Sequence, residues 1–317
     1  MINKLKQTLM ATATIVFTAC GGGSGTSDNQ TNGSSVGASG GAGTFSGVNS
    51  GKKLKKITTI TEDKVKFTVT EYTYNSNDLV EKIVKTFYDG DSEQGTMTLK
   101  SVSKYTYEKI YNVVKIESAT YGKNDKKINT STSSQTYNDD KIVTLKITSV
   151  GSKTEVTFSD YEGFIAKKAF SKTKGASDSE SNTVIKVTEN KASEIKVTSK
   201  MSHYNGTEIS SLTYDSLDRV TEVSSNMRSV KFSYDNDKSK IEPKYTCFGG
   251  YVKIIENHRT RYSKAQNTCY LATGKKQDMY GKKTKITYVN TVKNGLVTKR
   301  IEKEDDKVTM TYTYEYE

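Results

Sequence analysis

The sequence predicts an all-β protein: an antiparallel sheet of repeated hairpins, curled or partly closed into a half-barrel or shell, after a disordered N-terminal tether. Composition, alternation and repetition support this prediction. The 317 residues include 21 Tyr, no Trp and a single proline. Beyond residue 51, β-branched and aromatic residues alternate with polar ones, a pattern that favours strands over helices. A unit of tyrosine and turn residues recurs along that part of the chain.

Residues 1–19 have the layout of an export signal. Lys4 and Lys6 supply a short positive region, and residues 9–19 form an uncharged, apolar run. That run is too short to cross a bilayer, which takes about 20 apolar residues. The sequence therefore indicates a signal peptide, which is removed on export.

The end of this segment, Phe17-Thr18-Ala19-Cys20, resembles the lipobox of bacterial lipoproteins. The resemblance implies cleavage before Cys20, lipid on its sulfur, and a fatty acid such as palmitate on its new amino end. Several acyl chains, at about 0.8 kcal/mol per buried methylene, hold a protein stably on a membrane. Gly21 follows the cysteine, which by the same resemblance implies an outer-membrane location, on the periplasmic or surface face. An ordinary cleaved signal with an incidental cysteine is the alternative.

Residues 20–51 combine Cys20 with a linker. Eleven of the chain's 23 glycines lie in this stretch, among Ser, Thr and Asn, with hardly an apolar residue. Such a composition buries too little surface to offset the entropy of ordering. We expect a flexible tether with a typical reach of about 30 Å.

Residues 52–317 form the predicted β-repeat domain, which is basic. It carries 46 Lys and Arg against 35 Asp and Glu, a formal charge of about +11. The lysines are spread singly along the expected strands, where lysine commonly discourages aggregation through strand edges. The other interpretation is an anionic partner, either envelope polysaccharide or acidic lipid.

The repeat unit is an alternating strand that ends in x-Thr-Tyr, a turn of Asn, Asp, Ser or Gly, and a second alternating strand. Asn and Asp tolerate left-handed backbone and close hairpins. Successive hairpins paired side by side make a long sheet, which native twist curls. The clearest copies are Tyr72–Ile83, Tyr105–Ile116, Gln135–Leu145 and Leu212–Val223; weaker copies begin at Phe158, Phe232 and Tyr288, and the chain ends on Tyr312-Thr-Tyr314-Glu-Tyr316.

One copy, Tyr214-Asp215-Ser216-Leu217-Asp218-Arg219-Val220, resembles the YD repeat (Tyr-Asp-x-x-Gly-Arg-Leu) of the bacterial RHS and wall-associated families. Asp218 stands where that repeat has glycine, and most copies lack the arginine. The body is also similar to the less regular tyrosine-turn repeats of bacterial surface lipoproteins. The resemblance implies a repeat-built β-sheet and no particular activity.

The repeat lapses in an insertion at about 239–281, which contains the chain's proline and its two remaining cysteines. With Cys20 lipidated, Cys247 and Cys269 are an even pair in an oxidising compartment, so we expect a disulfide. Two buried thiols are the alternative. Aromatic and basic residues around the pair make the insertion either a binding site or a stapled corner of the sheet; the candidate binding residues are Tyr245, Tyr251, Arg259, Arg261, Tyr262 and Tyr270.

Catalytic patterns are scarce. The chain has two histidines, His203 and His258, and no nucleophile elbow, HExxH or P-loop. The stretch that begins at Asp89 hints at a calcium loop, but Lys100 stands at the twelfth position, so we expect a hairpin tip. The carboxylate pairs at 139–140 and 305–306 lie in expected turns. The sequence points to no cofactor, metal or nucleic acid, and it leaves enzymatic activity uncertain while favouring a non-enzymatic role.

The sequence therefore predicts a lipid-anchored cell-envelope protein with a binding or structural role. The alternative is a surface polysaccharide-processing hydrolase on a β-sheet scaffold. A tyrosine face that is fully buried favours the scaffold, whereas an open groove with Tyr and two facing carboxylates favours the enzyme.

Overall fold

The computed structural model describes residues 53–77, 80–109, 112–139, 141–162, 165–175, 178–188, 191–201, 204–216, 220–226, 228–234, 272–279, 281–294 and 296–317. Over these ranges the secondary structure is β-strand, apart from the short 3-10 segment η2 (Lys123–Asp125). No helix in this part of the chain is long and apolar enough to cross a membrane.

Eighteen strands, from 6 to 14 residues long, follow one another in the described ranges. They are β1 (Leu54–Thr61), β2 (Lys66–Tyr74), β3 (Val80–Asp89), β4 (Thr96–Lys109), β5 (Asn112–Tyr121), β6 (Lys127–Asn138), β7 (Lys141–Ser149), β8 (Ser152–Glu162), β9 (Ile165–Gly175), β10 (Ser179–Thr188), β11 (Lys191–Met201), β12 (Tyr204–Tyr214), β13 (Val220–Ser225), β14 (Arg228–Tyr234), β15 (Ala272–Met279), β16 (Lys282–Lys293), β17 (Leu296–Glu304) and β18 (Lys307–Tyr316).

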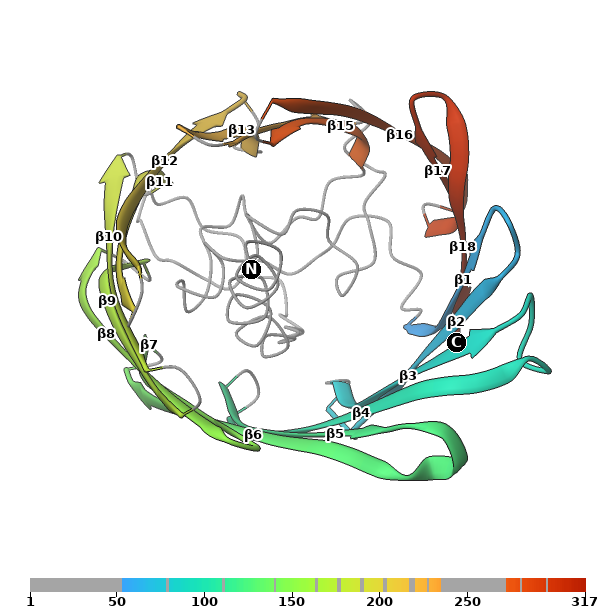
Figure 1. The fold of residues 1–317 in the computed structure, drawn as a ribbon, viewed down its shortest axis with the longest axis horizontal. Helices are drawn as coiled ribbons and strands as arrows, with labels where there is room; N and C mark the ends of the chain where they lie inside the picture. Colours follow the sequence, from blue (N-terminus) through green and yellow to red (C-terminus); the bar gives the residue numbers. More distant parts are fainter. Residues whose placement is uncertain are drawn as a thin grey trace, which may run out of the picture.

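Each strand pairs antiparallel with its neighbours in the sequence, and β1 pairs with both β2 and β18. The sheet is thus a closed up-and-down barrel, seen as a ring in Figure 1. The predicted antiparallel hairpin sheet is confirmed. The predicted partial closure is wrong: twist accumulates over the strands until the first meets the last, with Ile57 opposite Tyr314, and none of the eighteen described strands is left at an unpaired edge.

Over most of the wall the two faces differ in chemistry, as β7 and β8 illustrate; in β2 and β3, Val69 and Thr86 are buried on the face opposite that of Ile83, which packs against the core. Leu145 lies opposite Val156, and both side chains are buried. One residue further, Lys146 lies opposite Glu155, and both are exposed. We assign the buried face to the lumen, because side chains that point toward the axis of a cylinder crowd one another whereas those outside diverge. These surfaces are called the inner face and the outer face below.

The barrel has two ends. At the tyrosine end, even-numbered strands finish and odd-numbered strands begin, so Leu54 lies there opposite Tyr316 near the C-terminus. Toward this end the inner face is aliphatic and aromatic, and it holds most of the buried core. Toward the opposite end the inner face of β5–β7 becomes Ser and Thr, since Ser131 lies opposite both Ser118 and Ser149, whereas in β3–β4 it keeps Phe87 opposite Leu99.

Several predicted turns are confirmed. Asp305 and Asp306 both have positive φ, 46° and 67°, and form the two-residue turn between β17 and β18. Asp139 and Asn294 adopt the same left-handed conformation between β6 and β7 and between β16 and β17. Asp and Asn adopt it at low cost, which is why the sequence places them at hairpin turns.

Candidate functional site

All the site residues predicted from the sequence lie outside the described ranges. This holds for the lipidated cysteine, the expected disulfide pair, the candidate binding residues of the insertion and both histidines: Cys20, Cys247, Cys269, Tyr245, Tyr251, Arg259, Arg261, Tyr262, Tyr270, His203 and His258. Lipidation, disulfide formation and binding by the insertion therefore stay predictions.

The stretch from Asp89 is a hairpin tip, as expected. It joins β3 to β4, and its Glu93 Oε1 lies 2.6 Å from Lys56 Nζ. Within the described ranges, no group of His, Cys, Asp and Glu side chains has the arrangement of a metal site.

The most regular feature of the wall is a belt of tyrosines at the tyrosine end. Each tyrosine lies at or near the end of an even-numbered strand, and its hydroxyl donates a hydrogen bond to a backbone carbonyl where the preceding odd-numbered strand begins. The O–O distances are 2.7 to 3.0 Å in six of these bonds. The donor and acceptor pairs are Tyr74–Leu54, Tyr107–Val80, Tyr137–Val113, Tyr161–Ile142, Tyr214–Ala192, Tyr234–Val220 and Tyr316–Val297.

The belt is interlocked from hairpin to hairpin. Val80 lies opposite Tyr74 and accepts the hydroxyl of Tyr107, while Val113 lies opposite Tyr107 and accepts that of Tyr137. All seven acceptor residues are buried. Each bond contributes about 0.5–1.5 kcal/mol, because folding exchanges a bond to water for one within the protein. These tyrosines are structural ties between successive hairpins.

Burial also favours the protonated form of one belt phenol, that of Tyr161. It raises the pKa of Tyr161 to about 12. A protonated phenol that already donates to a carbonyl is a poor general base. The belt therefore favours the scaffold interpretation of the tyrosine repeat over catalysis.

Two even-numbered strands leave the belt incomplete. β10 has Val187 at the belt position, opposite Ala192, and β16 has Val292, opposite Val297. The register still shifts at both positions, between Lys186 and Val187 and between Thr291 and Val292. The bulge of the repeat is thus kept where its tyrosine is absent.

This bulge determines which residue faces the lumen in eight of the nine odd-numbered strands. In β9 both paired strands advance by three residues, with Tyr161 opposite Ala166 and Phe158 opposite Ala169. The next inner-face residue comes three positions after the residue that lies opposite the belt position, so Ile116 follows Val113 and Leu145 follows Ile142. Seven strands have an aliphatic side chain there: Ile57, Ile83, Ile116, Leu145, Ala169, Ile195 and Val223. In the remaining two the residue is cationic: Lys275 on β15, opposite the buried Phe232, and Arg300 on β17.

Arg300 is the more deeply buried of the two, with 1% of its surface exposed. Its Nε donates to Asn290 Oδ1 at 2.8 Å, and its Cζ lies 5.1 Å from the centroid of the Tyr288 ring. Such a contact stabilises a cation over the face of an aromatic ring. A guanidinium keeps its charge even when buried, so the lumen wall carries a fixed positive charge here.

Next to Arg300 on the inner face, Glu302 accepts two hydrogen bonds. They come from the hydroxyls of Thr309 and Tyr312, each at 3.3 Å. Burial, and then the charge of Glu302, raises the pKa of Tyr312. The phenol is thus a donor and not a base, and this cluster is suited to holding charge in place and not to moving protons.

Sequence reasoning missed Arg300 and Lys275 because simple alternation assigns the wrong phase. Alternation groups Val297 with Lys299 and Ile301, which predicts Arg300 on the wet face. The bulge at the start of β17 reverses that phase. The signal that was available is the three-residue spacing seen in the clear repeats, as in Val113 and Ile116.

The outer face carries ion pairs between neighbouring strands. Lys146 and Glu155 lie 3.3 Å apart, Lys172 and Glu180 2.6 Å apart, and Lys231 and Glu222 3.3 Å apart. Such exposed pairs each contribute about 0–1 kcal/mol. These pairs reduce the repulsion between neighbouring lysine-rich strands.

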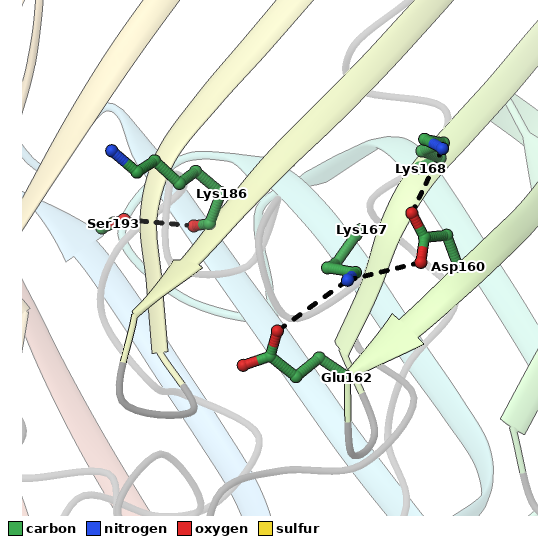
Figure 2. A network of polar contacts seen from close by, with 6 residues as sticks. All are labelled: Asp160, Glu162, Lys167, Lys168, Lys186 and Ser193. Atoms are coloured by element: carbon green, nitrogen blue, oxygen red, sulfur yellow. Dashed lines mark hydrogen bonds and ion pairs between the residues drawn. The ribbon is translucent and has the colours of Figure 1, made fainter.

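Figure 2 looks through the β8–β9 wall, with strands of the opposite wall behind it. Asp160 lies 3.2 Å from Lys168 Nζ and 3.3 Å from Lys167 Nζ, and Glu162 lies 3.9 Å from Lys167 Nζ. Hydrogen bonds from Lys168 and Lys167 lower the pKa of Asp160. On the next hairpin, the Ser193 hydroxyl donates to the Lys186 carbonyl at 3.2 Å. These contacts stabilise the ends of the β8–β9 and β10–β11 hairpins at an exposed surface.

No protein-family model matches the sequence, and no curated protein does. Solved structures of similar shape include a porin-like protein from Bacteroides uniformis, with 14% identity and a TM-score of 0.39 over 83% of this chain and 98% of that one. Another is a porin-like protein from Bacteroides vulgatus, with 10% identity and a TM-score of 0.38 over 84% of this chain and 99% of that one. Similarity at this level supports no inference about activity.

Proposed function

We propose that this chain is a lipid-anchored protein of the cell envelope, a barrel that stands in water beside the membrane and has a binding or structural role. The observation that carries the proposal is the chemistry of the outer face. A barrel that spans a bilayer needs an outward apolar band about 25 Å tall. Here the outer face instead carries pairs such as Lys146 with Glu155 and Lys172 with Glu180.

A barrel with such an exterior requires another means of membrane attachment. The lipobox-like residues 17–20 supply it in this proposal, with lipid on Cys20 and the Gly/Ser-rich residues 21–51 as a tether. The proposal includes a disulfide between Cys247 and Cys269 and an outer-membrane location. The belt tyrosines support the relation to tyrosine-turn repeats, because they occupy the anchor positions of the sequence repeat.

The alternative, a polysaccharide-processing hydrolase, gains no support from the described residues. Asp160 and Glu162 are engaged by lysines, and the belt phenols donate to backbone carbonyls. The buried tyrosine end is the arrangement expected of a scaffold.

The test of anchoring is Cys20→Ala in the full chain, followed by membrane fractionation with a high-salt wash and by fatty-acid labelling. We expect loss of label and release of a folded barrel into the soluble fraction. Cys269→Ser is the matched control, because it removes a thiol elsewhere; we expect it to keep both label and membrane retention. A Cys20→Ala protein that stays with salt-washed membranes would contradict the proposal.

A further inference from the structure

On the outer face of β14, β15 and β16, three lysines form a ladder. Lys231 lies directly opposite Lys276, and Lys276 lies directly opposite Lys285. All three side chains are exposed. Neighbouring strands are about 4.8 Å apart, so three positive charges stand in a row across the wall. The name lysine ladder is used below for these three residues.

Elsewhere on the described outer face, lysines lie opposite one another at most in pairs, as Lys82 with Lys104 and Lys153 with Lys174, so a row of three is distinctive. Lys146 and Lys172 each have a glutamate on the neighbouring strand. Within the ladder, only Lys231 has one, since Glu222 Oε2 lies 3.3 Å from its Nζ. The central residue, Lys276, has a lysine on both sides. Like charges directly opposite one another destabilise a sheet.

Carboxylates near the ladder leave its charge largely uncompensated. At one margin, Asp305 Oδ1 accepts a hydrogen bond from the backbone N–H of Lys285 at 3.4 Å. Asp278 lies on the same face of β15, but the exposed Lys283 stands opposite it. The outer face of β14–β16 is therefore a basic strip of the barrel.

We propose that the lysine ladder binds a linear anionic polysaccharide, which would lie along the row. This inference rests on the proposed envelope role and names the partner and the surface. Ammonium groups are point charges without the planar fork of arginine, so they suit repeated carboxylate, sulfate or phosphate groups alike. The partner would neutralise the repulsion that the folded wall retains.

The geometry favours a linear polymer over a lipid surface as the partner. The row runs from strand to strand around a convex wall, where a flat bilayer would touch only a narrow line and a flexible polymer can follow the curve. Lipid insertion also needs apolar side chains beside the charges. Of the described residues on β14–β16, Val289 is the one large apolar side chain that is clearly exposed, and it lies four residues beyond Lys285.

The test uses the full-length lipidated protein in detergent, with polygalacturonate as the probe and neutral dextran as the blank. The variant is Lys231→Gln, Lys276→Gln and Lys285→Gln together. We expect the apparent Kd to rise about tenfold, because exposed charge contacts each contribute a few-fold in affinity. We also expect wild-type binding to weaken as salt is added.

The matched control removes the same charge from paired lysines: Lys115→Gln, Lys146→Gln and Lys172→Gln together. It should shift the apparent Kd by less than about twofold, since those charges are already compensated. An equal loss in both triple variants would overturn the proposal, as would binding to anionic phospholipid vesicles without binding to the polymer. Membrane fractionation of the ladder variant separates the two proposals, because failure here leaves anchoring through Cys20 untouched.

Discussion

Two stretches of the barrel wall, β7–β8 and β14–β17, have the same fold and different chemistry. In β7–β8, the inner face is aliphatic, with Leu145 opposite Val156, and outside it Lys146 is matched by Glu155. In β14–β17, the inner face carries the buried Arg300, and outside it Lys276 faces two lysines. The repeat therefore determines the backbone structure, whereas the chemistry of the side chains differs between its copies.

The difference indicates which part of the wall is the better candidate for a functional site. A repeat copy that keeps its aliphatic and paired residues is explained by folding alone. A copy that replaces an aliphatic residue with a buried arginine, or a paired lysine with a ladder, accepts a cost in stability that folding does not explain. The contrast between the two walls can be tested by substitutions at matched positions.

The largest effect is expected at the inner face of the regular wall. Leu145→Ala should lower the free energy of unfolding by about 2–4 kcal/mol, because it leaves a cavity among Ile142, Val156 and Phe158. Chemical denaturation measures this change. Thr144→Ala, one residue away on the outer face, is the control and should change stability by less than about 0.5 kcal/mol. Equal effects at the two positions would contradict the difference in burial between the two faces of β7.

Much of the backbone structure could be predicted from the sequence. The period-two pattern and the x-Thr-Tyr turns give the strands, and residues such as Asp305 and Asp306 give turns with positive φ. Closure could not be predicted, because it depends on the twist summed over all strands and on the contact of β1 with β18. Arg300 was missed because a bulge, which alternation does not encode, reverses its face.

A smaller effect is expected at the belt. Tyr161→Phe removes the hydroxyl that donates to the Ile142 carbonyl and should cost about 0.5–1.5 kcal/mol at neutral pH. Because burial raises the pKa of Tyr161 from 10.0 to about 12, the unfolded chain loses this proton first, and stability falls as pH rises between those values. Tyr161→Phe has no phenol at this position, so it should lack that part of the loss of stability at alkaline pH.

Denaturation of both proteins across the alkaline range measures this difference. Val292, at the position of a missing belt tyrosine, provides the control: Val292→Ala removes apolar contacts and no phenol, so its alkaline slope should match that of the wild type. A Tyr161→Phe protein with an unchanged alkaline slope would show that the phenol does not titrate differently in the folded barrel.

The smallest effect is expected on the outer face, where two matched substitutions should change stability in opposite directions. Lys276→Glu places a carboxylate between Lys231 and Lys285 and should raise the free energy of unfolding by about 0.2–1 kcal/mol. Lys146→Glu makes the same substitution opposite Glu155 and should lower stability by a similar amount. Both changes should shrink as salt is added, since the charges are exposed. If the two variants shifted stability in the same direction, net charge and not local pairing would govern the outer face, and the two walls would not differ in the way proposed.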